Sequence, residues 1–297
     1  MQLPIIKYRA IWFTFSGLLV IGCIAALLKF PLQFGIDFTG GSLMEVTFSQ
    51  NRPDIGELRQ ALTDDKNAEV LVQTSGDKGV LIRMRHMDEP DHQAVLAKIK
   101  AVHADAQELR FESVGPTVGD ELRRNAVWSM AAVLIAIALY IAYAFRKVSR
   151  PVASWKYGII TLIAALAHDV LLPIGAFAIL GTYQHIELNS AFVAAVLTIL
   201  GFSVHDTIVV FDRIRENLVK AGGTFNDIVE RSVNETLARS INTSLTATFP
   251  LVAIYLWGGE SLHQFALALI IGMIAGTYSS IFLAAPLLVV MQKKGSR

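Results

Sequence analysis

The sequence contains little cysteine, with Cys23 standing alone among 297 residues. A single cysteine excludes an internal disulfide and a cysteine-rich metal site. No Gly-Lys-Ser/Thr follows the glycines of residues 35–41, so the chain also lacks a P-loop. No Ser/His/Asp set and no cluster of metal ligands is evident in the sequence. We therefore expect a protein that is not an enzyme and that has no metal site and no cofactor.

Charge is also scarce, because charged residues make up only 17% of the chain. Lys and Arg number 26 and Asp and Glu number 25, a balance that gives no indication of a nucleic-acid partner. Hydrophobic residues make up 53% of the chain, which is typical of polytopic membrane proteins.

Six apolar segments have roughly the 20 residues that a membrane-spanning helix needs. They cover residues 10–30, 126–145, 156–181, 191–211, 241–258 and 265–291. The fifth segment is shorter and more polar than the others. The expected fold class is a polytopic α-helical membrane protein with six transmembrane helices.

The first apolar segment has an alternative interpretation. Residues 20–23, Val-Ile-Gly-Cys, follow Lys7, Arg9 and an apolar run, which is the outline of a lipoprotein cleavage site. The apolar run continues through residues 25–28, and this favours an uncleaved transmembrane helix.

Lys and Arg predict the orientation, because they gather in alternate connections. The short connections at residues 182–190 and 259–264 contain neither residue type. The positive-inside rule then predicts that both termini are cytoplasmic, that residues 31–124 are extracytoplasmic and that residues 212–240 form a cytoplasmic loop. The expected division is 1–30, holding the N-terminal tail and helix 1, then 31–124, then 125–297, holding helices 2–6.

Residues 31–124 have the pattern of a small α+β domain between helices 1 and 2. Strands are expected at 42–49, 70–74, 80–84 and 109–114, and helices at 53–63 and 89–103. This β-α-β-β-α-β order predicts a ferredoxin-like domain. Gly115-Pro116 should break the chain before a helix that leads into the second span. Thr224 should cap an amphipathic surface helix at 225–238.

Two acidic residues lie inside expected spans, Asp169 in the third and Asp206 in the fourth. At 1.5 Å per residue both reach the middle of the membrane, and each follows a histidine, His168 or His205. Ionisable residues at this depth are costly and usually mark an ion or proton path. We therefore predict a proton relay with Asp206 as the carrier. The alternative is that these groups only form hydrogen bonds between helices.

Arg239 and four hydroxyl residues accompany the expected fifth span. Arg239 stands at its inner end, where it either reaches toward Asp206 or anchors the helix by extending to the membrane surface. Hydroxyl groups inside the span either line a hydrated path or bond to neighbouring helices. These hydroxyl residues are Thr243, Ser244, Thr246 and Thr248.

Two glycine motifs predict local structure. Gly272 and Gly276 form a GxxxG pattern in the sixth span, followed by two serines, which predicts close packing against another helix, internal or from a second protein. The segment GIDFTGG, with Gly35, Asp37, Gly40 and Gly41, is interpreted as a tight turn that joins the outer domain to the membrane.

Several motifs together resemble the SecF branch of the SecD/SecF family of bacterial protein-export membrane proteins, within the resistance-nodulation-division superfamily. They are GIDFTGGS at 35–42, VGPTVGDEL at 114–122, HDV at 168–170, FSVHDTIVVFDRIREN at 202–217 and GTYSSIFLAAPL at 276–287. The resemblance implies a location in the bacterial cytoplasmic (inner) membrane. It also implies SecD, the SecYEG translocon and YajC as partners, and translocating polypeptide as the substrate.

The same resemblance implies how such a protein works. The family uses the proton motive force to aid translocation, with its intramembrane aspartate at Asp206 and its functional arginine at Arg239. His205 stands where many relatives have Asn, so its role in proton transfer stays open. The family's other proton-carrying aspartate lies in SecD. Two alternatives remain: half of a superfamily exporter of lipids or small molecules, and a scaffold without ion coupling.

Overall fold

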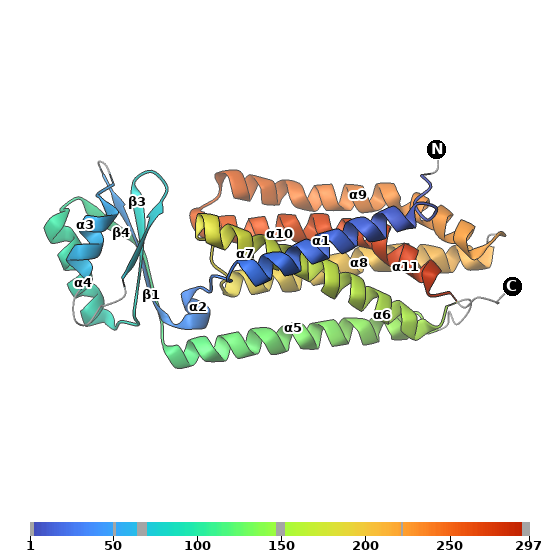
Figure 1. The fold of residues 1–297 in the computed structure, drawn as a ribbon, viewed down its shortest axis with the longest axis horizontal. Helices are drawn as coiled ribbons and strands as arrows, with labels where there is room; N and C mark the ends of the chain where they lie inside the picture. The colour runs from blue at the N-terminus through green and yellow to red at the C-terminus, as the bar shows by residue number, and fades with distance from the viewer. Residues whose placement is uncertain (1–2, 50–51, 64–69, 147–151, 221, 293–297) are drawn as a thin grey trace. The chain divides into compact units, whose positions relative to one another are not determined.

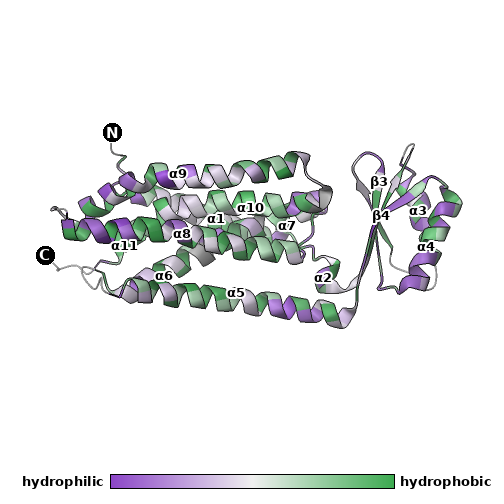
Figure 2. Cartoon of the chain, turned by 180° about the vertical axis from the view of Figure 1, so that it is seen from behind, coloured by the Kyte–Doolittle hydropathy of each residue, from purple (hydrophilic) through white to green (hydrophobic). Residues whose placement is uncertain are grey.

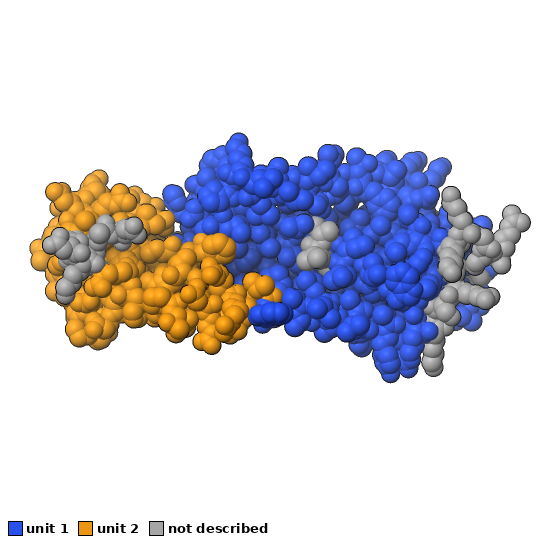
Figure 3. All heavy atoms as spheres, turned by 60° about the horizontal axis from the view of Figure 1, so that its bottom comes forward, with its two compact units in different colours: residues 1–33, 128–297 blue, residues 34–127 orange. Residues whose placement is uncertain are grey.

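A computed structural model of the chain describes residues 3–49, 52–63, 70–146, 152–220 and 222–292. The chain divides into two compact units. One is helical and consists of Met1–Gln33 and Trp128–Arg297, and the other, Phe34–Val127, is α/β (Figure 3). The α/β unit lies close to the expected range 31–124.

The α/β unit contains a four-stranded antiparallel sheet in the order β2-β3-β1-β4. Its elements are α2 (Ile36–Thr39), β1 (Gly41–Phe48), α3 (Ile55–Leu62), β2 (Leu71–Ser75), β3 (Gly79–Met84), α4 (Glu89–Val102) and β4 (Ala106–Val114). From β1 onward the element order is the β-α-β-β-α-β that the sequence predicts. The assignment to the ferredoxin-like class stays a prediction.

One face of this sheet forms the core of the unit. Alternate residues of β1, namely Met44, Val46 and Phe48, are fully buried, as the period of two in a strand requires. They pack with Leu58 of α3 and Ile99 of α4, and Figure 1 shows both helices on the same side of the sheet.

The helical unit consists of long helices, two of which contain a π-helical segment. Its elements are α1 (Arg9–Lys29), α5 (Pro116–Ala144, which begins in the α/β unit), α6 (Ser154–Ala164), η1 (Ala165–Val170), α7 (Leu171–Gln184), α8 (Ser190–Lys220), α9 (Phe225–Trp257), α10 (Glu260–Ser279), η2 (Ser280–Ala284) and α11 (Ala285–Val290). As predicted, α5 begins directly after Gly115.

Within the described residues, five helical stretches are long and apolar enough to cross a membrane. They are Arg9–Lys29, Pro116–Ala144, Ser154–Gln184, Ser190–Lys220 and Leu262–Val290. Figure 2 shows apolar residues along these helices. The chain is thus a multi-pass membrane protein. The remaining expected span, 241–258, lies in α9 and is not among the five, so the sixth span stays a prediction.

The structure differs from the expected loop at 212–240. α8 continues to Lys220, and α9 runs without a break from Phe225 to Trp257. The expected surface helix 225–238 and the expected fifth span are therefore one helix. Thr224 caps it as predicted, in a reciprocal capping box with Asp227. The helix continues because no glycine or proline follows until Pro250.

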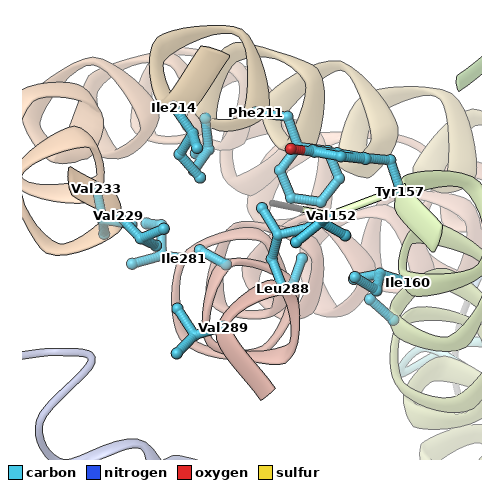
Figure 4. Close-up of a cluster of buried hydrophobic side chains, with 14 of the residues drawn as sticks. Val152, Tyr157, Ile160, Phe211, Ile214, Val229, Val233, Ile281, Leu288 and Val289 are labelled. Carbon is cyan, nitrogen blue, oxygen red and sulfur yellow. The ribbon is translucent and has the colours of Figure 1, made fainter. Parts of the chain in front are cut away.

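Aromatic side chains hold α6 and α8 together near the end of the helical unit that carries the N-terminal tail. The rings of Phe145 and Tyr157 stack at 5.0 Å, and the ring of Phe211 meets both edge-on. Figure 4 shows Tyr157 beside Phe211, with aliphatic side chains of α9 and α11 nearby. This cluster lets α8 and α9 remain packed beyond their apolar spans.

The N-terminal tail is fixed to α9 by backbone hydrogen bonds. The carboxylate of Glu230 accepts from the N–H groups of Ile5 at 2.5 Å, Ile6 at 3.0 Å and Lys7 at 3.3 Å. These are N–H groups that precede α1 and would otherwise lack helical partners. The side chains of Ile5 and Ile6 are buried in the same core as α9.

Candidate functional site

Asp206 lies on α8 and is only 5% exposed. Its Oδ1 accepts a hydrogen bond from the Ser240 hydroxyl at 2.6 Å, and its Oδ2 accepts one from the Ser280 hydroxyl at 2.5 Å. Ser240 belongs to α9, and Ser280 is the first residue of η2. One carboxylate therefore joins three helical elements.

Asp169 lies in η1 and is completely buried. Its Oδ2 accepts hydrogen bonds from the hydroxyls of Ser203 on α8 and Ser279 on α10, the latter at 2.9 Å. Its Oδ1 lies 3.1 Å from Nδ1 of His168. The Asp169 carboxylate is thus in contact with α8, with α10 and with the His168 imidazole.

The two carboxylates belong to one buried polar cluster. Ser203 and Asp206 are one turn apart on α8, so they lie on the same face of that helix. Ser279 and Ser280 are consecutive, and each donates to a different carboxylate. The structure therefore brings Asp169 and Asp206 together, as their similar depth in the sequence suggests. We call these seven residues the carboxylate cluster: His168, Asp169, Ser203, Asp206, Ser240, Ser279 and Ser280.

Both π-helical segments adjoin this cluster. η1 contains Asp169, and η2 begins at Ser280. Single π-helical turns are rare, and they are found frequently at functional sites. In each π-helical segment the regular α-helical hydrogen-bond pattern is interrupted, in η1 at Asp169 and in η2 at Ser280, which contacts Asp206.

The polar contacts of Asp206 come from neutral groups. Its hydrogen-bond partners among the described residues are the hydroxyls of Ser240 and Ser280, and no Lys or Arg of the described residues forms an ion pair with it. The carboxylate is therefore held between helices by hydroxyl donors and not by a fixed positive charge.

Arg239 does not contact Asp206. Its side chain is exposed and forms no ion pair with a described residue. Arg239 directly precedes Ser240, and neighbouring helical residues point about 100° apart, so only Ser240 faces the carboxylate. Arg239 instead lines a cavity of about 400 Å³, whose other residues are Ile208, Val209, Asp212, Arg213, Glu216, Glu235 and Thr236.

His205 is likewise outside the carboxylate cluster. It precedes Asp206 on α8, and its side chain is exposed while that of Asp206 is buried. The same 100° rotation explains the difference. Of the four residues predicted for the relay, the structure joins Asp169 and Asp206 and leaves Arg239 and His205 at the surface.

Ion pairs close the ends of α8 and α9 beside this cavity. Arg213 donates to Glu235 at 2.6 Å and to Glu216 at 2.8 Å. The pKa of Glu235 is lowered to about 2, chiefly by the hydrogen bond from the Asn217 amide and then by Arg231 and Arg213. Glu235 is therefore a fixed negative charge at neutral pH.

Gly272 and Gly276 bring α10 against α8. A Cβ atom at Gly272 would collide with the Ile199 side chain, and one at Gly276 would lie 2.8 Å from the Cβ of Ser203. The predicted packing partner is thus internal. This close approach has a consequence for the site, because it lets Ser203 and Ser279 reach the same carboxylate of Asp169.

The glycine turn lies in the α/β unit. Gly35 precedes the short helix α2, which contains Asp37, and Gly40 follows it. Gly40 and Gly41 have φ values of 71° and 122°, and a Cβ at Gly41 would lie 2.9 Å from the Met84 carbonyl oxygen. These glycines are required by the backbone, in agreement with a tight turn.

The sequence indicated the carboxylates more clearly than their donors. Ser279 and Ser280 stand out in the sequence only as the two serines that follow the GxxxG pattern, and Ser240 has no signal of its own. A usable signal was available in the spacing, because Ser203 lies one turn before Asp206. Of the hydroxyl residues noted in the expected fifth span, Ser244 is buried and bonded to Thr277, whereas Thr243 and Thr246 are exposed.

The fold and site define a multi-pass membrane protein with a small α/β unit and a buried pair of carboxylates. Residues 94–294 match the family described as "Protein export membrane protein SecD/SecF, C-terminal", and residues 25–51 match the "SecD/SecF GG Motif". The chain belongs to the SecD/SecF family.

Similar proteins agree with this assignment. The chain is 43% identical to "Protein translocase subunit SecF" of Thermobaculum terrenum, over 99% of this chain and 95% of that protein. It is 37% identical to the SecF subunit of Synechocystis sp., over 97% and 93% of the two chains.

Among solved structures, the crystal structure of SecDF from Thermus thermophilus, a translocon-associated membrane protein, matches with a TM-score of 0.84 and 32% identity. The match covers 98% of this chain but only 38% of the SecDF chain. A structure of SecDF in its super-membrane-facing form matches with a TM-score of 0.65.

Proposed function

We propose that this chain is the SecF subunit of a bacterial protein translocase, and that with SecD it uses the proton motive force to promote protein translocation across the cytoplasmic membrane. The names of its relatives support a translocation role, and the SecDF match supports SecD as the partner. SecYEG, YajC and the translocating polypeptide complete the proposed assembly. The proposal includes six spans, a ferredoxin-like outer domain, and both termini in the cytoplasm.

The observation that carries this proposal is the buried carboxylate of Asp206 between three helical elements. An ionised Asp206 accepts from both Ser240 and Ser280, and such charge-assisted hydrogen bonds are stronger than neutral ones. Protonation weakens them and turns one carboxylate oxygen into a donor. Loading a proton would thus bias the packing of α9 and η2 against α8, as a two-state mechanism requires.

Asp169 is the proposed second acid of the relay, because its donor Ser203 lies on α8 with Asp206 and its donor Ser279 directly precedes Ser280, the donor to Asp206. Arg239 and His205 are proposed to act from the surface of the chain. Exposed polar side chains at membrane depth are unfavourable toward lipid. Such side chains are favourable where a protein partner covers them, and Arg239 could pair with a carboxylate of that partner. We therefore propose that SecD packs against this face. The exposed polar residues are Thr198, His205, Arg239, Asn242, Thr243 and Thr246.

The test is export into inverted membrane vesicles that contain SecD and either wild type or Asp206→Asn, with and without a proton gradient. Asn keeps the size and an acceptor but cannot titrate. We expect the gradient-dependent part of export to disappear while expression and SecD binding remain. Unchanged export with Asn would contradict proton coupling at Asp206.

A further inference from the structure

His168 carries an unpaired ring nitrogen inside the helical unit. The side chain is 1% exposed, its Nδ1 lies 3.1 Å from Asp169, and its Nε2 has no hydrogen-bond partner among the described residues. Leaving a buried polar atom unsatisfied is costly, and such atoms in native structures call for a catalytic, strain or water-binding explanation.

The ring cannot easily turn to satisfy Nε2. Its face stacks on the Tyr278 ring at a centroid distance of 5.3 Å and an angle of 26°. Tyr278 is itself fixed, because its hydroxyl donates to the Trp12 carbonyl and accepts from Ser16. Since Nδ1 is held at Asp169, the opposite edge of the imidazole, with Nε2, points away from that carboxylate.

We propose that His168 is the group through which Asp169 exchanges protons with water, with Nε2 as the atom that meets the water. The proposal rests on the proton-coupled function and adds a second titrating residue to it. In the loading step, Nε2 of a neutral His168 accepts a proton from hydronium, and the Nδ1 proton passes to Asp169. One proton has then moved from water to the pair, whose charge changes from −1 to 0.

The surroundings of His168 support transfer to Asp169 rather than to another acid. The helices α1, α6 and α7 pack on η1 and contain no Asp, Glu or His. Their other titratable or charged residues are Cys23, Lys156, Tyr157, Tyr183, and Arg9 and Lys29 at the two ends of α1. α8 brings Ser203 to Asp169, with Asp206 one turn further, and α10 brings Tyr278. Among the described contacts, Asp169 is the acid that touches the imidazole.

The first test replaces His168 by Asn in the complex with SecD. Asn keeps an amide N–H near the position of Nδ1, so it preserves the hydrogen bond to Asp169, but it has no ionisable group and no Nε2. We expect at least about a tenfold loss of gradient-driven export, in line with other proton-transfer groups, and a changed pH profile. The exposed His185, replaced by Asn, is the control, because Asn tolerates its positive φ of 56°.

The second test holds even if the variant fails to fold. In wild-type protein with ¹⁵N-labelled histidine, the ring signals of His168 should change tautomer or become imidazolium as pH is varied through about 5.5–9. They should respond to Asp169→Asn. A single neutral tautomer throughout, or an unchanged rate and pH profile in His168→Asn, overturns the proposal. If Asp206→Asn keeps full gradient dependence, the proposed function fails instead.

Discussion

Ser279 and Ser280 are consecutive residues whose hydroxyl groups donate to different buried carboxylates, Asp169 and Asp206. They stand where the α-helix α10 changes into the π-helix η2. A shift of this junction therefore changes both contacts at once. In the proposed relay, protonation of Asp206 that releases Ser280 would therefore also act on the neighbouring bond to Asp169. The proposed coupling of the two acids would pass through the backbone at this junction.

The first prediction concerns Ser280→Ala. It removes one of the two hydroxyl donors of Asp206, so a buried carboxylate oxygen loses its partner, and we expect a loss of about 1–3 kcal/mol in stability together with reduced gradient-driven export. Thermal unfolding in detergent and vesicle export measure the two effects. Ser280→Thr should restore part of both. Thr182→Ala is the matched control, because that hydroxyl bonds only to its own helix at Ala178.

A second prediction concerns the packing of α10 on α8. Gly276→Ala places a Cβ 2.8 Å from that of Ser203, and overpacking of this kind costs about 1–3 kcal/mol. We expect a lower unfolding temperature and weaker export. Gly22→Ala is the control, since nothing lies within 4 Å of its added Cβ and alanine favours a helix interior. Equal unfolding temperatures for the two variants would show that α10 does not require this glycine.

Much of the architecture follows from hydrophobic length and turn chemistry. The apolar segments predicted the five candidate spans, and the alternation of 42–49 predicted β1, because both patterns depend on local sequence. Counting residues along adjacent helices predicts similar depths for Asp169 and Asp206, and the structure shows both buried with donors that are consecutive in the chain. α9 was expected as two helices, since the change from charged to apolar sequence near residue 240 resembles a boundary although no helix breaker occurs there.

The composition of the site was less accessible from sequence. His205 and Arg239 each precede a residue of the carboxylate cluster, but sequence neighbours on a helix do not share a face. Ser240 and Ser280 are 34 and 74 residues from Asp206, so only tertiary packing brings them to it. The π-helical segments also depend on that packing. Neither segment contains a proline or glycine, but Pro173 and Pro286 follow them closely, and each removes the hydrogen bond to the carbonyl four residues earlier, which is a signal that the sequence did offer.

A third prediction concerns the turn of the α/β unit. Gly41→Ala forces a side chain onto a backbone with φ of 122° and within 2.9 Å of the Met84 carbonyl oxygen. We expect loss of the native α/β unit, because strand β1 begins at this residue and pairs with both β3 and β4. Limited proteolysis of the membrane-embedded protein measures it. Gly115→Ala, where the added Cβ meets nothing within 4 Å, should leave the unit resistant, and equal cleavage of both would refute the argument.

A fourth prediction concerns His92 in the same unit. The ring is buried, stacks on Phe111 at 3.7 Å, and places Nδ1 3.2 Å from Glu89 and Nε2 2.9 Å from Glu108. Replacing it by Ala removes the stacking partner and both polar contacts, and we expect a destabilisation of about 2–4 kcal/mol. Hydrogen exchange of β4 should show the loss directly. His185→Asn, in the other unit, should leave that exchange unchanged.

The last prediction concerns pH and the ion pairs at the ends of α8 and α9. The pKa of Glu235 is lowered to about 2, first by Asn217 and then by Arg231 and Arg213, whereas an unfolded glutamate titrates near about 4.3. A lowered pKa means that the ionised form is favoured in the folded protein, so its stabilising contribution is complete above the unfolded pKa and is lost as pH falls toward the folded value. The stability difference between wild type and Glu235→Gln should therefore be constant from neutral pH to about 5 and should shrink below about 4. Chemical unfolding in detergent between these pH values measures it. A difference that grows on acidification would show that Glu235 is not held ionised by these partners, and that another acid dominates the pH dependence of this end of the bundle.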